Sequence, residues 1–330
     1  MQTNLPMKTL SLLLFVLLAL TDPGYAEVRK FPTSDELRRE LGAKAELHLD
    51  QPYAGNANPR QMLDLYLPKQ RAGDKPLPVV AYIHGGGWGA GDRKRAASMM
   101  AAQAASGNYA GVSIGYRLSA EASWPAQIHD AKAAIRWLRG HAKEFNFDPE
   151  RIAVWGGSAG GHLVSLLGTS GEVQELEGDL GEFTKLSSRV SCVVNLCGPS
   201  DLTAPLRSGD AALQEDTAIT GLLGGPLDKK RDLARAASPL THVTPDDAPF
   251  LTAHGTKDER VNFSHAVNLD AALKKAGVPS LLIPIAGGGH GIQGGPELAG
   301  RIQQFLDLHL RGVKADISSE PIPTQTPPAK

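Results

Sequence analysis

The sequence predicts an α/β protein in which a mostly parallel, twisted sheet carries helices on both faces. Apolar runs of strand length alternate with helical patterns along the 330 residues, and strands joined through helices pair in parallel by right-handed crossovers. Most of these runs are continuously apolar, which is typical of strands covered on both faces. The hydrophobic content of 42% is enough for one large core.

The strands are expected in a definite order. The run at 61–67 alternates leucine with polar or aromatic residues, which favours an antiparallel, half-exposed strand near the start. The complete expected set is 45–49, 61–67, 79–83, 110–115, 152–156, 190–196, 249–253 and 280–284.

Helices are expected at 94–107, 127–144, 158–167, 264–277 and 296–311. Pro125 marks the start of the second, and Gly277 and Gly312 are typical helix stops. A mixed-charge helical stretch at 30–44 is interpreted as a solvated face. Two long segments without strand patterns, 168–188 and 203–239, are expected over the carboxyl ends of the strands, where ligands bind in such folds.

Both ends of the chain are expected to lie outside the catalytic domain, which is assigned to 27–312. Residues 1–26 have the pattern of a signal peptide: Lys8, an apolar run at 10–20, and small residues at Gly24 and Ala26. The apolar run at 10–20 is shorter than the roughly 20 residues that a bilayer span takes, so we expect it to be removed by cleavage after Ala26. The mature protein is then expected to be secreted or periplasmic, without membrane insertion. An uncleaved membrane anchor is the alternative. The Pro-, Ser- and Thr-rich stretch 313–330 is expected to be disordered.

The net charge argues against some classes of partner, and the spacing of the cysteines argues against a disulfide. The formal net charge of −1 offers no excess of either sign, which argues against nucleic acid or an anionic membrane as a partner. Cys192 and Cys197 are five residues apart along one expected strand, about 16 Å, whereas a disulfide needs Cα atoms within about 7 Å. We therefore expect two free, buried thiols.

The most informative motif is GGSAGG at 156–161, between an expected strand and an expected helix. A strand that turns sharply into a helix exposes the central side chain, and the flanking glycines relieve crowding. The helix N-terminus behind it favours negative charge. Ser158 is thus the candidate nucleophile.

A serine hydroxyl needs a base and an acid that orients the base. His290, in the glycine-rich loop after the last expected strand, is the candidate base. His254 is its nearest rival and is interpreted as packing a turn, and His265 is expected to be solvated.

Asp258 is the candidate acid, in the loop after the strand at 249–253. Its neighbour Glu259 is expected to point to solvent. Asp201 also follows a strand and is the main competitor, although a turn or helix cap explains it equally well. The chain order Ser, Asp, His is one of the known orders for such a triad.

The sequence HGGGW at 84–88 follows a buried strand. Its glycines leave room for backbone N–H groups to bind an oxyanion, and we assign this role to Gly86, Gly87 and Ala159. A phosphate-binding loop is the alternative, but the run lacks the Gly-Lys-Ser/Thr ending and the spaced glycines of a dinucleotide site. No metal or organic cofactor is therefore expected.

Taken together, these motifs resemble the α/β-hydrolases of the esterase/lipase superfamily, near the hormone-sensitive-lipase-like and the feruloyl or acetyl-xylan esterase-like branches. The matching segments are LDLYLP at 63–68, HGGGW at 84–88, GYRL at 115–118, PAQIHD at 125–130, GGSAGG, and the loops of Asp258 and His290. The resemblance covers most of the chain. One departure is the charged pair Glu259-Arg260 after the acid, where relatives often carry an apolar residue or proline.

The resemblance implies a serine hydrolase that cleaves carboxylic esters through an acyl-enzyme. Export without a basic or amphipathic membrane segment favours short-chain or carbohydrate-linked (acetyl or feruloyl) esters as substrates. Trp88 and Trp124 are candidates to line a substrate pocket, and core packing explains them equally well. A peptidase or a lipase on the same fold is an alternative. A binding module that has lost catalysis is an alternative of another class.

Overall fold

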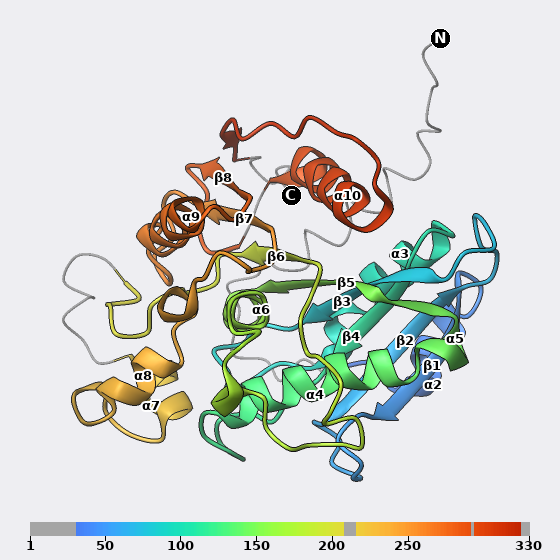
Figure 1. Ribbon diagram of the computed structural model, residues 1–330, viewed down its shortest axis with the longest axis horizontal. Coiled ribbons are helices and arrows are strands. Elements are labelled where there is room, and N and C mark those ends of the chain that lie inside the picture. Colours follow the sequence, from blue (N-terminus) through green and yellow to red (C-terminus); the bar gives the residue numbers. More distant parts are fainter. Residues whose placement is uncertain (1–30, 208–215, 292–293, 325–330) are drawn as a thin grey trace.

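The computed structural model describes residues 31–207, 216–291 and 294–324, and a nine-stranded sheet runs through them (Figure 1). The strand order is β1-β2-β4-β3-β5-β6-β7-β8-β9. β2 is antiparallel to both β1 and β4, and every other neighbouring pair is parallel. The mostly parallel sheet that the alternating pattern predicts is confirmed.

All eight expected strands are present. Their bounds are β1 (Ala45–Pro52), β2 (Met62–Pro68), β3 (Leu77–Ile83), β4 (Ala110–Ile114), β5 (Phe147–Gly157), β6 (Cys192–Leu196), β7 (Phe250–Gly255) and β8 (Ser280–Ala286), followed by the unexpected β9 (Ile322–Pro323).

The expected helices are also present, with shifted ends. The α-helices are α2 (Ser34–Leu41), α3 (Ala97–Ala105), α4 (Ala126–Gly140), α5 (Ala142–Phe145), α6 (Ala159–Thr169), α7 (Thr217–Leu223), α8 (Arg231–Ala236), α9 (Ser264–Ala276) and α10 (Gly295–Arg311). The helix expected at 127–144 breaks at His141 into α4 and α5. Gly277 and Gly312 end α9 and α10 in left-handed conformations, as predicted.

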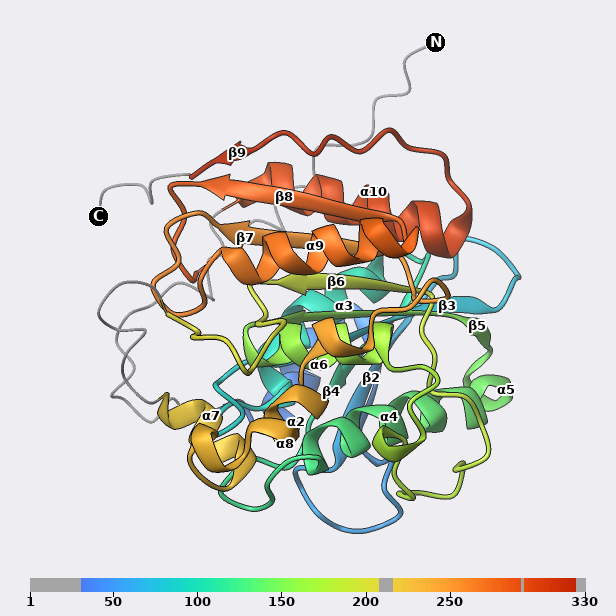
Figure 2. The same cartoon turned by 60° about the vertical axis from the view of Figure 1, so that its left-hand side comes forward.

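Helices cover both faces of the sheet (Figures 1 and 2). On β3, Val79, Ala81 and Ile83 belong to the core that packs on α4, α6 and α9. Val80 and Tyr82 belong to the core that packs on α2, α3 and α10. Such alternation along one buried strand explains why its sequence is continuously apolar.

The N-terminal helical stretch is only half solvated. The side chain of Thr33 accepts a hydrogen bond from the Glu36 N–H and starts α2 with a capping box. Leu37 and Leu41 are each 2% exposed and join the second core. The mixed charges therefore occupy the outer side of a helix that is docked by its leucines.

The expectation that 313–330 is disordered is wrong for residues 313–324. β9 pairs with β8 in parallel, and Ile322 is 1% exposed. Arg301 of α10 donates hydrogen bonds to the carbonyl oxygens of Ser318 and Glu320. One buried side chain and a few backbone hydrogen bonds order this segment, although its sequence is rich in Pro, Ser and Thr and lacks apolar periodicity. Residues 325–330 lie outside the described residues.

The position expected for 168–188 is wrong for the start of this segment. α6 begins at the carboxyl end of β5 and runs back along the sheet, so Gly168 lies near the opposite edge, where its carbonyl oxygen accepts from Ala248 just before β7. Glu177 then pairs with Lys132 and Arg136 of α4. This segment packs along α4, and only its middle part reaches the carboxyl-end edge of the sheet, where Gly181 meets the Tyr53 carbonyl oxygen just after β1.

The described part of the segment 203–239 lies where it was expected, over the carboxyl ends of the strands. The Trp124 N–H donates to the carbonyl oxygen of Leu222 in α7. The His162 imidazole bonds the Ala237 carbonyl oxygen after α8. Because His162 lies in the first turn of α6, this places the segment at the carboxyl end of the sheet.

The N-terminal signal at 1–26, including the cleavage position after Ala26, lies outside the described residues. Across 31–207, 216–291 and 294–324, no helix has both the length and the apolar character that crossing a bilayer requires.

Candidate active site

Ser158 occupies the tight turn between β5 and α6. Its backbone has φ 55° and ψ −122°, a conformation that costs energy for any residue but glycine. The turn is tight enough that a Cβ at Gly156 would lie 2.4 Å from the carbonyl oxygen of Gly160. A Cβ at Gly160 would lie 2.1 Å from the Ile83 carbonyl oxygen. The glycines are therefore required, and the partly exposed hydroxyl stands at the start of α6.

Ser158, His290 and Asp258 form one hydrogen-bonded chain. His290 Nδ1 lies 2.8 Å from Asp258 Oδ2, and His290 Nε2 lies 2.9 Å from Ser158 Oγ. A carboxylate oxygen can only accept, so Nδ1 carries the hydrogen and the neutral ring accepts the serine proton at Nε2. All three predicted residues meet, although 132 positions separate Ser158 from His290.

Asp258 is held by four donors. Oδ1 accepts the backbone N–H groups of Arg260 and Val261 at 2.8 and 2.9 Å. Oδ2 accepts from His254 and His290. Burial by itself would raise the pKa of Asp258, but the hydrogen bonds from the two histidines outweigh it and hold that pKa well below 3.8. The group stays ionised beside the imidazole.

Burial also acts on His290, whose side chain is 22% exposed. Burial by itself lowers the pKa of His290, but the hydrogen bond to the Asp258 carboxylate and the negative charge of that carboxylate raise it. The net pKa lies above its ordinary value of 6.5. A raised pKa strengthens the ring as a proton acceptor.

The rival residues have other roles. Asp201 Oδ1 accepts the Thr203 N–H at 2.8 Å and the Thr203 hydroxyl at 2.6 Å, as a turn cap does. Glu259 is exposed, as expected. The solvated position expected for His265 is wrong: it is 3% exposed and bonds Ser200 and Pro205, because α9 packs that side against the end of β6.

The HGGGW loop lies directly against the serine turn. A Cβ at Gly85 would lie 2.6 Å from the Gly157 carbonyl oxygen and 3.3 Å from Ser158 Cβ. Gly86 and Gly87 have φ of 126° and 59°, which only glycine adopts without strain. Both are partly exposed, and Ala159 begins α6, where backbone N–H groups lack helical partners. Gly85 therefore holds the loop beside Ser158, and the oxyanion role of Gly86, Gly87 and Ala159 stays a prediction.

The tentative assignment of Trp88 to a substrate pocket is wrong for this structure. Its indole is 2% exposed and its Nε1–H donates to His162 Nδ1 at 3.2 Å. Trp124 is 5% exposed and packs edge-on against the same histidine. Both tryptophans take the core-packing alternative, because α7 and α8 close over this side of α6. No sequence pattern predicts that His162 is their shared partner.

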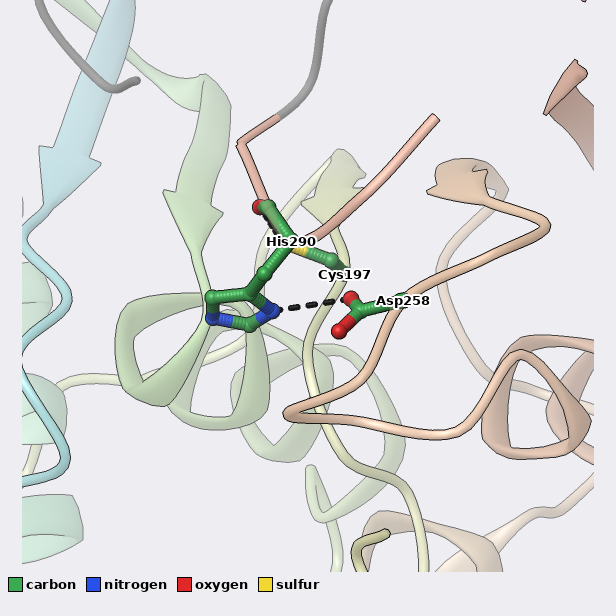
Figure 3. A group of neighbouring side chains, drawn as sticks. All are labelled: Cys197, Asp258 and His290. Atoms are coloured by element: carbon green, nitrogen blue, oxygen red, sulfur yellow. Dashed lines mark hydrogen bonds and ion pairs between the residues drawn. The ribbon is translucent and has the colours of Figure 1, made fainter. Parts of the chain in front are cut away.

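Both cysteines are free and buried, as predicted. The Cys197 thiol, just after β6, donates to the carbonyl oxygen of His290 at 3.3 Å. Figure 3 shows Cys197 beside the backbone of His290, and the imidazole bonded to Asp258. Sequence reasoning missed this contact, although Cys197 shares with the other site residues its place at the carboxyl end of a strand.

Cys197, Asp258 and His290 also form the one group in the described ranges with three possible metal ligands, one atom from each lying within 4.8 Å of the others. Asp258 already accepts four hydrogen bonds, two of them from histidine rings. The Asp258 and His290 side chains bond each other, and the Cys197 thiol bonds the His290 carbonyl oxygen. A metal ion would have to displace these hydrogen bonds.

With this geometry established, comparisons place the chain among known proteins. The BD-FAE family profile matches residues 63–273. The chain belongs to this family. Its fold is that of the α/β-hydrolases, as the resemblance in the sequence implied.

Individual relatives agree with this placement. Esterase LipC of Mycobacterium tuberculosis is 32% identical over 240 residues, which cover 71% of this chain and 57% of LipC. The chain spans about half the length of the curated relatives it matches. Among solved structures, a truncated carbohydrate esterase from gut microbiota superposes with a TM-score of 0.69 at 32% identity, covering 79% of this chain and 92% of that one. Thermogutta terrifontis esterase 2, phosphoramylated by tabun, superposes with a TM-score of 0.59 at 27% identity, covering 75% and 85%.

Proposed function

We propose that the chain is a serine carboxylesterase in which Ser158 is the nucleophile, His290 the base and Asp258 the residue that orients the base. The observation that carries the proposal is the unbroken chain from Ser158 Oγ to Asp258 Oδ2 through both nitrogens of His290. The relatives named above as esterases support the same reaction.

The reaction follows from the geometry. His290 Nε2 takes the hydroxyl proton as Ser158 attacks the ester carbonyl, and the ionised Asp258 stabilises the imidazolium that forms. The tetrahedral oxyanion binds the N–H groups of Gly86, Gly87 and Ala159. His290 then protonates the leaving alcohol, and an acyl group remains on Ser158. Water activated by His290 releases the acid and restores the serine.

The oxyanion donors lower the reaction barrier because their positions are fixed before substrate binds. The left-handed torsions of Gly86 and Gly87 and the contact of Gly85 with the serine turn hold the loop before substrate binds. Each donor of this kind lowers the barrier by about 3 kcal/mol.

For the substrate we propose short-chain or carbohydrate-linked esters, with acetyl or feruloyl groups, met outside the cytoplasm after export. The name of the gut carbohydrate esterase supports the carbohydrate-linked part. The signal-like residues 1–26 support export.

Substitution of the nucleophile tests the reaction. Ser158→Ala should lower turnover of p-nitrophenyl acetate by about 10⁴-fold or more, and a fluorophosphonate probe should label the wild-type chain at Ser158 and leave the variant unlabelled. Persistence of turnover in a folded Ser158→Ala variant would contradict the proposal. A wild-type chain that neither reacts with the probe nor hydrolyses esters would instead be a binding module.

A substrate panel tests the specificity. Acetate esters should be hydrolysed faster than octanoate esters. Acetylated xylan or methyl ferulate should be cleaved by the wild-type chain and not by Ser158→Ala. Preference for octanoate would contradict the substrate proposal and favour a lipase. Export is tested by expressing the full chain and sequencing its N-terminus, which should begin at Glu27.

A further inference from the structure

His254 places a second imidazole on the Asp258 carboxylate. It lies near the end of β7 and is 0% exposed. Its Nε2 is 2.8 Å from the Val261 carbonyl oxygen and 3.0 Å from Asp258 Oδ2. Because a carbonyl oxygen can only accept, Nε2 must carry the hydrogen. A single N–H is therefore shared between the loop backbone and the carboxylate.

This bond falls on the oxygen that matters for the reaction. Asp258 Oδ2 receives both His254 and His290, while Oδ1 receives two backbone N–H groups of its own loop. Two donors on each oxygen fix the plane of the carboxylate. Among these donors His254 is the side chain that takes no part in proton transfer, and it stands on β7, which pairs with β6 and β8.

We propose that His254 is a positioning residue of the esterase reaction: its Nε2–H holds the Asp258 carboxylate at the angle from which Oδ2 accepts the Nδ1–H of His290. This inference rests on the proposed function, because it assigns His254 to the support of that triad.

The other groups around the pair leave this task to His254. Cys197, after β6, bonds the backbone of His290. His265, in α9, accepts from Ser200 and lies beside the Pro205 carbonyl. Asp201, after β6, binds Thr203, and the Phe263 ring packs edge-on against His254 at 5.8 Å.

The arrangement has a measurable electrostatic consequence. The positive end of the His254 N–H dipole points at Asp258 Oδ2, the oxygen that also accepts from His290. Removing that N–H leaves more of the carboxylate charge to act on the imidazolium, so protonated His290 becomes more stable. The acid side of the pH profile should then move to higher pH while turnover falls, and a purely structural role would change turnover without moving the profile.

The test compares three variants of the full chain. His254→Leu removes the donor, His254→Gln places an amide N–H near the Nε2 position, and His254→Asn is too short to reach it. We expect kcat for p-nitrophenyl acetate to fall about 10- to 100-fold in His254→Leu and His254→Asn, and to stay within about threefold of wild type in His254→Gln. His265→Leu, which removes a buried histidine that does not bond Asp258, is the matched control and should leave the pH profile in place.

Two results would overturn the inference. One is a folded His254→Leu variant with wild-type kcat and pH profile. The other is an equal loss in the Gln and Asn variants with an unmoved profile. If His254→Leu does not fold, the Gln and Asn pair still decides, because both are polar and differ in reach.

Failure of this inference is distinguishable from failure of the proposed function. The pKa of His290, followed by NMR in a Ser158→Ala background, should rise when His254 becomes Leu, and this readout needs no catalysis. Turnover that survives Ser158→Ala would contradict the reaction but leave the His290 titration as a valid test of His254.

Discussion

At Ser158 the backbone torsion, the flanking glycines and the following helix all act on one hydroxyl group. The strained torsion lifts the side chain out of the sheet, and the glycines make the turn sterically possible. These local requirements are visible in the sequence, which is why the GGSAGG motif identified the residue. How deeply a single side chain is buried depends on segments far away in the sequence, and the expectations for Trp88 and His265 were wrong for that reason.

A matched pair of substitutions decides whether Asp258 or Asp201 is the acid of the triad. Asp258→Asn should lower kcat by about 10⁴-fold, because the amide no longer stabilises the imidazolium or fixes its tautomer. Asp201→Asn keeps an acceptor for Thr203 and should remain near wild type. Steady-state kinetics on p-nitrophenyl acetate measures both, and a large loss in Asp201→Asn with activity retained in Asp258→Asn would reverse the assignment.

The raised pKa of His290 sets the sign of the pH dependence. The reaction needs the neutral ring, so kcat/KM should fall as pH drops and His290 gains a proton. Because neighbouring negative charge raises this pKa above 6.5, half-maximal activity should lie above pH 6.5. In Asp258→Asn the residual activity should show its half-maximum at lower pH, since the stabilising carboxylate is gone. A midpoint that moves upward in that variant would contradict the electrostatic account.

At the scale of elements, the strands were predictable because each is a continuous apolar run covered by helices on both sides. β9 was not, since two residues with one buried side chain leave no pattern. The position of the start of 168–188 was missed because it depends on the direction in which α6 runs, which no residue in that segment encodes. The contact of Cys197 with His290 likewise depends on the order of β6, β7 and β8 in the sheet.

The C-terminal segment 313–324 should contribute to stability and to the order of the His290 loop. Thr324 bonds the Ala286 carbonyl oxygen through both its N–H and its hydroxyl, at the start of that loop. Deleting 313–330 should therefore lower Tm by several degrees and reduce kcat. Deleting only 325–330 is the control and should change neither. Differential scanning fluorimetry and ester kinetics measure the pair, and equal behaviour of the two truncations would show that the segment is dispensable.

Loss of Ile322 alone isolates the packing part of that contribution. The side chain is buried in the core shared with α10, and Ile322→Ala should cost about 2 kcal/mol of unfolding free energy. Urea denaturation measures the change. Lys314→Ala, at an exposed position of the same segment, is the control, and an equal effect of both substitutions would contradict burial of Ile322.

At the scale of the whole molecule, the two apolar cores on either side of the sheet hold the fold, with no disulfide between its two cysteines. Cys192 begins β6 and is 0% exposed, and Cys197 follows the strand and is 4% exposed. Dithiothreitol should therefore leave Tm unchanged. A thiol reagent should react slowly with the native protein and with two thiols once it is unfolded. A Tm that drops in reductant would mean that a covalent bond supplies stability that we assign to packing, and rapid reaction of the native protein would mean that β6 is less enclosed than the structure shows.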